Sequence, residues 1–214
     1  MKKIFILLTI VILCTGCVRI DSTENIDIIV DEIINNKTNP NTMARGYKYF
    51  LPLGVSKTYD KDYNEKFKYE SAFIYLYVDA VSYYYKNSLN FDEENNINNY
   101  YYRKITNGNK TGYIVIKKVD EKKYFLKIVY NYAKIEAYAD KDNIEKVMTN
   151  SMIILDSIDY NDKLIEKILK DDYSIGVEKE YKIDKPKDAR SKFSEYLSED
   201  VQEEDAGVSD LPDY

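Results

Sequence analysis

The only two cysteines of the chain stand three residues apart, in the run Cys14-Thr15-Gly16-Cys17. A C-x-x-C pair is a candidate for dithiol redox chemistry or for metal binding when it lies inside a folded domain. Here the pair follows Lys2, Lys3 and an apolar run of about ten residues, which is the pattern of a secretory signal peptide. The run is too short for a membrane-spanning helix, which needs about 20 residues. The position of the pair therefore favours a targeting signal over a reactive dithiol.

The ending Leu13-Cys14-Thr15-Gly16-Cys17 resembles the lipobox of bacterial membrane lipoproteins, although Cys14 stands where the pattern usually has Leu. The resemblance covers only residues 1–17. It implies that residues 1–16 are a signal peptide and that Cys17 carries diacylglycerol, together with N-linked acyl chains such as palmitate. It also implies a lipid-anchored protein on the extracytoplasmic face of the cell membrane. Each buried CH₂ of a lipid contributes about 0.8 kcal/mol to anchoring.

The composition excludes several catalytic classes. The chain has no His, so Ser-His-Asp and Cys-His catalysis and His-ligated zinc are excluded. After loss of Cys14 and lipidation of Cys17, the mature chain also has no free thiol. No catalytic, cofactor or metal motif is visible. The richness in Asn, Lys, Ile and Tyr fits an AT-rich genome, such as that of a Gram-positive bacterium of low GC content.

Tyrosine dominates the middle of the chain, with 18 of its 23 tyrosines between Tyr47 and Tyr138. The run 71–85 alternates at period two, which predicts one long strand with an aliphatic and an aromatic face. The aromatic face would hold a candidate binding surface made of Tyr75, Tyr77, Asp79 and Tyr83. Tyrosine rings with hydroxyl edges suit sugars, peptides and protein surfaces. The alternative is a sheet that uses tyrosine as a filler of its outer surface.

Two other groups of residues are weaker candidates for a functional site. Asp79 together with Glu136 would form a carboxylate pair if the fold brought them close. Arg45 could hold an anion. The loop Asn107 to Gly112 has glycines and a lysine but lacks the spacing of a phosphate-binding loop, and it is expected to be a hairpin turn.

The elements that position these residues follow from their periodicity. Ile26, Ile29, Val30, Ile33 and Ile34 form a helical stripe that Ser22 or Thr23 could cap. The segment 99–140 predicts three strands with turns at 107–109 and 120–123, the last of them carrying Tyr130 and Tyr132, and 47–56 predicts one more strand. Residues 142–158 and 162–170 predict helices. The expected fold is α+β: a twisted antiparallel sheet of four to six strands packed on N- and C-terminal helices.

The expected organisation has four parts: a signal peptide (1–16), a lipid-anchored tether (17–24), a single α+β domain (25–173), and a charged extension with a disordered tail (174–214). Residues 195–214 contain eight acidic residues and no basic one. No nucleic-acid partner is expected, because the body carries no basic excess. The function expected from all of this is a non-catalytic binding or accessory lipoprotein at the cell envelope, with an envelope protein or a small ligand as partner. The alternatives are a solute-binding lipoprotein and a carboxylate-dependent hydrolase of envelope polymers.

Overall fold

A computed structural model describes residues 22–87 and 98–171. The chain divides into two units, residues 1–179 and 180–214, and all the described residues belong to the first. The predicted signal peptide, the lipidation site Cys17, most of the tether and the acidic tail lie outside the described residues. No described helix is long and apolar enough to cross a membrane.

The predicted α+β class is confirmed, but the number of strands was predicted too low. A seven-stranded antiparallel sheet has the order β3-β4-β5-β9-β8-β7-β6, and a separate three-stranded sheet has the order β1-β2-β10. The large sheet contains β3 (Val55–Lys61), β4 (Asn64–Tyr69), β5 (Ala72–Val78), β6 (Tyr101–Asn107), β7 (Lys110–Lys118), β8 (Lys123–Tyr130) and β9 (Ala133–Asp140). The small sheet contains β1 (Thr42–Met43), β2 (Tyr47–Tyr49) and β10 (Asp159–Tyr160).

Two of the extra strands arise from turns that contain no glycine. Asn131 and Tyr132 both have positive φ, at 53° and 60°, and they separate β8 from β9. Tyr132 is therefore a turn residue, and the prediction that it shares a strand with Tyr130 is wrong. Asp62 and Tyr63 turn the chain between β3 and β4 in the same way, with φ of 50° and 66°. The predicted hairpin at Gly108 is confirmed, because Asn107 pairs with Lys110.

The predicted strand 47–56 was also wrong in its extent. Residues Tyr47–Tyr49 form β2 of the small sheet, whereas Val55 begins β3 of the large one. Pro52 lies between them and has no N–H to donate to a strand ladder. The chain therefore passes from one sheet to the other at this proline.

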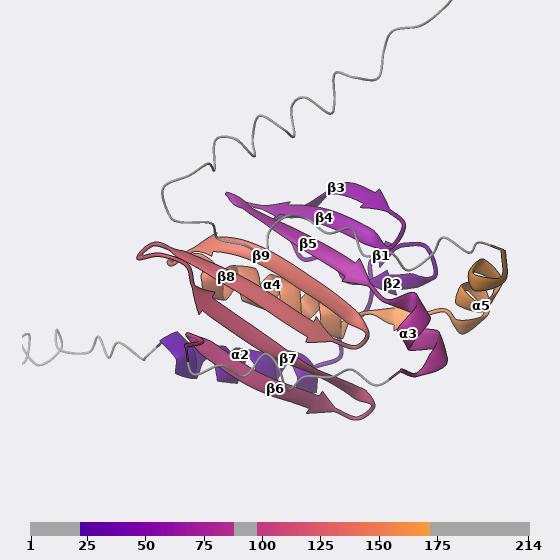
Figure 1. The fold of residues 1–214 in the computed structure, drawn as a ribbon, viewed down its shortest axis with the longest axis horizontal. Helices are drawn as coiled ribbons and strands as arrows, with labels where there is room; N and C mark the ends of the chain where they lie inside the picture. The colour runs from indigo at the N-terminus through magenta and orange to yellow at the C-terminus, as the bar shows by residue number, and fades with distance from the viewer. Residues whose placement is uncertain (1–21, 88–97, 172–214) are drawn as a thin grey trace, which may run out of the picture. The chain divides into compact units, whose positions relative to one another are not determined.

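Helices and the small sheet cover one side of the large sheet. Helix α4 (Ile144–Asp156) contacts β5, β8 and β9, and α2 (Ser22–Asn35) packs against α4. Figure 1 shows α4 behind β8 and β9, with α2 beside β6 and β7. Met148 and Met152 of α4 and Val30 of α2 are fully buried, as their predicted stripes require. Two further helices are described, α3 (Ala80–Tyr85) and α5 (Asp162–Asp171), and they contact each other.

The alternation of the strands directs one set of side chains into this core. Ile74, Leu76 and Val78 of β5 are fully buried, as are Ile135 and Ala137 of the neighbouring β9. The residues that alternate with these along each strand project from the other side of the sheet, because successive strand residues point to opposite faces. That other side, opposite α4, is called the lysine face below, after the residues that it carries.

Candidate functional site

The four residues of the predicted binding surface do not share one face. Strand β5 ends at Val78, and Asp79 is the N-cap of α3, where its carboxylate accepts a hydrogen bond from Ser82 N at 2.8 Å. An aspartate that satisfies a free helical N–H favours the start of a helix over continuation of a strand. Tyr83 lies in α3, whereas Tyr75 and Tyr77 lie on the lysine face. The single long strand and the shared surface of these four residues are therefore corrected.

The carboxylate pair is not formed either. Glu136 stands opposite Tyr75 in the β5–β9 ladder, four residues from Asp79. At a rise of about 3.3 Å per residue, the two backbone positions are about 13 Å apart. Glu136 is buried, and its carboxylate lies 3.3 Å from Lys134 Nζ. Among the described residues, no group of three or more His, Cys, Asp or Glu side chains is placed to hold a metal ion.

Tyr83 belongs to an aromatic cluster that joins α3 to the small sheet. Its ring stacks on Tyr160 of β10 with centroids 3.8 Å apart, and it meets the edge of Tyr132 at 5.6 Å. Its hydroxyl donates a hydrogen bond to Asp162 at 2.7 Å. Burial, together with this bond to a carboxylate, raises the pKa of Tyr83 to about 12. Tyr83 is thus held in place by its neighbours.

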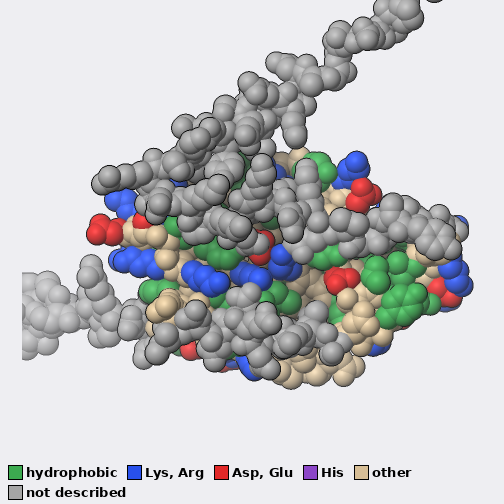
Figure 2. Space-filling view, viewed as in Figure 1, with side chains coloured by type: hydrophobic (Ala, Val, Ile, Leu, Met, Phe, Trp, Pro, Cys, Tyr) green, Lys and Arg blue, Asp and Glu red, His purple; other side chains and the backbone are tan. Residues whose placement is uncertain are grey.

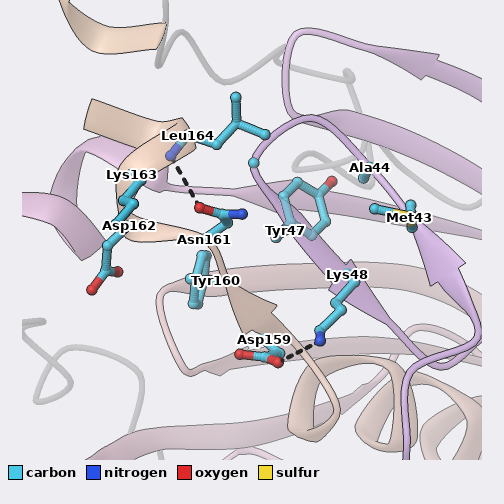
Figure 3. A pocket seen from close by; sticks show the side chains of 11 residues that line it. Met43, Ala44, Tyr47, Lys48, Asp159, Tyr160, Asn161, Asp162, Lys163 and Leu164 are labelled. Atoms are coloured by element: carbon cyan, nitrogen blue, oxygen red, sulfur yellow. Dashed lines mark hydrogen bonds and ion pairs between the residues drawn. The ribbon is translucent and has the colours of Figure 1, made fainter. Parts of the chain in front are cut away.

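A cavity of about 450 Å³ lies beside this cluster, between β1, β2, β10 and the first turn of α5. Figure 3 shows Tyr47 and Tyr160 together in its wall and an ion pair, Lys48 with Asp159 at 3.1 Å, at one end. Asn161 accepts a hydrogen bond from Leu164 N at 3.1 Å, which caps α5. The cavity offers tyrosine rings and both signs of charge to a small polar molecule. None of Tyr75, Tyr77 and Tyr83 lines it.

Behind Tyr47, a fully buried carboxylate ties the two sheets together. Glu65 of β4 accepts hydrogen bonds from the hydroxyl of Tyr47 and from that of Tyr49, the latter at 2.6 Å, and forms an ion pair with Lys57 at 2.7 Å. Burial is the main cause that raises the pKa of both tyrosines, followed by the charge of Glu65. Burial lowers the pKa of Lys57, but its bonds to Asp60 and Glu65 outweigh this and raise it. A buried charge that is paired and hydrogen-bonded fits a structural lock.

The lysine face displays polar and aromatic side chains from six strands, β4 to β9. Residues paired across the strands form rows along it, because their side chains project to the same side. The central row runs across six strands: Lys66, Tyr75, Glu136, Lys127, Val115 and Tyr102. A second row contains Tyr77, Lys134, Val129, Tyr113 and Lys104. The predicted Tyr75 and Tyr77 thus stand at one end of a much wider surface.

Charge on this face has one dominant sign. Strands β4 to β9 place seven lysines on it and two acidic residues, Glu136 and Asp140; the lysines are Lys66, Lys68, Lys104, Lys117, Lys123, Lys127 and Lys134. The whole chain, by contrast, has a net charge of −6. Figure 2 shows Lys and Arg side chains gathered in front of β8 and β9, with hydrophobic side chains beside them. The face therefore concentrates positive charge in an acidic protein.

Burial varies across the lysine face. Tyr113, Val115 and Phe125 are buried although they lie outside the main hydrophobic core, whereas Lys68, Lys104 and Lys117 are exposed. The remaining lysines and the tyrosines of β5 and β9 are half-buried. Lys66 Nζ lies over the rings of Phe73 and Tyr75, at 4.5 and 5.5 Å from their centroids. Rings that contact ammonium groups in this way are restrained by a cation–π interaction.

The lysine face, the cavity and Glu65 were missed by the sequence reasoning for different reasons. The lysines alternate with core residues in 123–130 and 133–138, so the same period-two pattern that predicts these strands could have placed Lys127 and Lys134 together with Tyr75. Glu65 and the cavity depend on contacts between distant segments, for which a single sequence has no signal. Arg45, the other candidate, is exposed and lies 3.8 Å from Asp62, which gives no anion site. No family model matches the chain, and no curated protein is significantly similar to it.

Proposed function

We propose that this chain is a lipid-anchored, extracytoplasmic accessory protein that binds a partner at the cell envelope and catalyses no reaction. The observation that supports binding most strongly is the lysine face, on which seven lysines and several tyrosines project from one side of the large sheet. Interfaces are enriched in aromatic residues, and charge complementarity selects the partner. The sheet holds these side chains in fixed register, so little order has to be gained when a partner binds.

The anchor is supported by the resemblance of residues 1–17 to a lipoprotein signal. In this proposal Cys17 carries the diacylglycerol, and the polar segment after it spaces the α+β domain from the membrane. Mass spectrometry of the mature N-terminus tests the anchor directly. The expected mass is that of a chain beginning at Cys17 with diacylglycerol attached; an unmodified thiol at Cys17 would refute the anchor.

Lysine footprinting tests the binding surface. An amine-reactive reagent is applied to intact, wall-bearing cells and, separately, to the purified protein, and the modification of each lysine is compared. Lys68, Lys104 and Lys117 report on the lysine face, and Lys146 and Lys163, exposed elsewhere, serve as controls. The proposal expects protection in cells at the first three lysines only. Equal modification of all five lysines in both samples would refute binding at this face.

A second candidate function, binding of a small solute, is favoured by the cavity beside Tyr47 and Tyr160. Its volume, about 450 Å³, falls within the range of about 300–1,000 Å³ that is usual for ligand sites. A solute that binds there should raise the melting temperature of the protein. Ala44→Leu, which adds a side chain at the lining of the cavity, should abolish that rise without removing the fold. A solute whose effect survives Ala44→Leu binds elsewhere.

A further inference from the structure

The start of α2 limits where a lipid on Cys17 can lie. Helix α2 begins at Ser22, five residues after Cys17. A chain spans at most about 3.6 Å per residue, so an anchor at Cys17 lies within about 18 Å of Ser22, whatever the conformation of the residues between. The end of the domain at which α2 begins is therefore the end that such an anchor holds near the membrane.

The contacts of α2 show which end of the large sheet this is. The hydroxyl of Tyr101, at the start of β6, donates a hydrogen bond to Asp27 at 2.6 Å, and Asn107, at the end of β6, donates to the carbonyl of Ile34. Helix α2 therefore runs alongside β6 in the same direction. Since β6 and β7 are antiparallel, the start of α2 lies at the end of the sheet where β7 turns into β8. Figure 1 shows the start of α2 and this turn at the same end of the sheet.

The turn between β7 and β8 has more lysines than acidic residues. Residues 117–123 contain four lysines and two acids. The Asp120 carboxylate accepts hydrogen bonds from the backbone N–H groups of Lys122 and of the residue after it, at 2.7 and 2.8 Å, so it lies against the backbone of the turn. Lys118 and Lys122 are exposed, and neither forms an ion pair with a described residue. Val119, which is 36% exposed, adds an apolar side chain next to Lys118.

Charge decides between two orientations that both place the start of α2 near a bilayer. In one the β7–β8 turn meets the lipid, and in the other the exposed flank of α2 does. Helix α2 has four acidic residues and no basic one, and Arg103 pairs with only two of them, Asp27 and Asp31. Beside the turn, residues 140–146 contain three acids and two lysines, so the positive excess belongs to the turn itself. An anionic lipid surface therefore attracts the turn and repels the flank of α2.

The cavity lies at the opposite end of the domain. Tyr160, in the wall of the cavity, donates a hydrogen bond to Asn131 O at 2.6 Å, and Asn131 lies in the turn between β8 and β9. Strand β8 separates this turn from the β7–β8 turn, and its seven steps of about 3.3 Å span about 23 Å. A domain that stands on the β7–β8 turn therefore holds the cavity away from the lipid.

We infer that the turn between β7 and β8 is a lipid-contact surface on which the anchored domain stands. The ammonium groups of Lys118 and Lys122 lie against the phosphates of anionic lipid headgroups, and Val119 lies among the headgroups with them. Weak contacts are sufficient to orient the domain, because the anchor keeps the turn at a high effective concentration beside the lipid. This inference rests on the lipid anchor of the proposed function and identifies the surface that meets the membrane.

The test uses the mature, lipidated chain in vesicles of phosphatidylglycerol and phosphatidylcholine. A fluorophore is attached to one introduced cysteine, and a nitroxide on the lipid headgroups quenches fluorophores close to the surface. The positions are Val119→Cys at the turn, Glu32→Cys on the flank of α2 and Lys163→Cys at the cavity. Quenching should be at least about fivefold stronger at Val119→Cys than at Lys163→Cys, because the length of β8 separates the two ends of the domain. It should also be stronger at Val119→Cys than at Glu32→Cys.

Charge reversal tests the role of the two lysines. Lys118→Glu/Lys122→Glu should weaken quenching at Val119→Cys at least about twofold in these anionic vesicles. The matched control, Lys163→Glu/Lys167→Glu, reverses two exposed lysines of α5 and should leave this quenching unchanged. Melting curves of all variants confirm that they fold.

Three results would overturn the inference: quenching that is strongest at Glu32→Cys or Lys163→Cys, equal quenching at all three positions, or no response to Lys118→Glu/Lys122→Glu. Mass spectrometry of the same protein separates these results from a failure of the proposed anchor. Any of them in a chain that carries lipid on Cys17 overturns the lipid-contact surface and leaves the anchor standing. An unmodified Cys17 refutes the anchor, and the lipid-contact surface with it.

Discussion

The buried carboxylate of Glu65 makes a demanding prediction about stability. Tyr49→Phe removes one hydroxyl that donates to Glu65 Oε2 at 2.6 Å, but keeps the ring that packs against Tyr47 and Phe67. Hydrogen bonds to charged groups contribute about 1.5–3 kcal/mol when they are buried. Since Glu65 is fully buried, water cannot replace the lost donor. We therefore expect Tyr49→Phe to lower the free energy of unfolding by about 1.5–3 kcal/mol.

Lys57 extends the same reasoning. Its ammonium lies 2.7 Å from the same oxygen, Glu65 Oε2, and its side chain is 23% exposed. Lys57→Met would leave the carboxylate without its cation; breaking a buried ion pair costs about 3–5 kcal/mol, and partial exposure places this pair near the lower end. Because the Tyr49 hydroxyl and the Lys57 ammonium share one oxygen of Glu65, the double variant Tyr49→Phe/Lys57→Met should show a coupling energy of about 0.5 kcal/mol or more.

Urea denaturation of the single and double variants measures these quantities, with Tyr85→Phe as the matched control. Tyr85 is 65% exposed, so its variant should change stability by less than about 0.5 kcal/mol. The m-value, which is the slope of the free energy of unfolding against urea concentration, should stay constant, since the surface exposed on unfolding does not change. If Tyr49→Phe behaves like Tyr85→Phe and the cycle shows no coupling, the lock between the sheets does not exist.

Three further predictions concern other parts of the chain. In Gly112→Ala the new Cβ would stand 1.9 Å from Val129 O, so we expect the free energy of unfolding to fall by about 3 kcal/mol or more. The control Gly108→Ala should cost about 1–2 kcal/mol, because φ is 58° there but nothing lies within 4 Å of the new Cβ. Equal losses in the two variants would contradict the close approach of β7 and β8. The pKa of Tyr83 is raised from 10.0 to about 12 in the folded protein, so the unfolded state releases this proton at a lower pH. The protein should therefore lose stability relative to its Tyr83→Phe variant as the pH rises between these two values. If denaturation at several pH values gives a constant difference in free energy of unfolding between the two proteins, this prediction is wrong. Cys17→Ser should move the protein from the membrane fraction to the soluble one, because the lipid supplies the attachment; retention in the membrane would mean another anchor.

The sequence predicts the regular elements well where a period is strong. The stripes of α2 and α4 were recognised because Ile26, Val30, Val147 and Met148 recur at helical spacing and are buried in the structure. The hairpin at Gly108 was recognised because glycine adopts positive φ without strain. The α+β class followed from these elements together.

The missed features share a physical cause: they depend on local competition or on long-range contacts. The alternation of residues 79–85 suits a strand, but Asp79 caps a helix start by accepting a hydrogen bond from Ser82 N, and Tyr83 stacks on the distant Tyr160. The turns at Asp62 and Asn131 use non-glycine residues with positive φ, which have no strong sequence signal. The position of Glu65 under Tyr47 and Tyr49 requires two sheets to meet, which periodicity cannot show.

The central claim, that the lysine face is the binding surface of this protein, is tested most directly by site-specific photocrosslinking in living cells. A photoreactive residue is placed at Phe73 and at Lys117 on the lysine face, and at the exposed controls Ile28 and Leu53. We expect the two face positions to become linked to an envelope component and the control positions to remain unlinked. Adducts that form at Ile28 or Leu53 but at neither face position would contradict it.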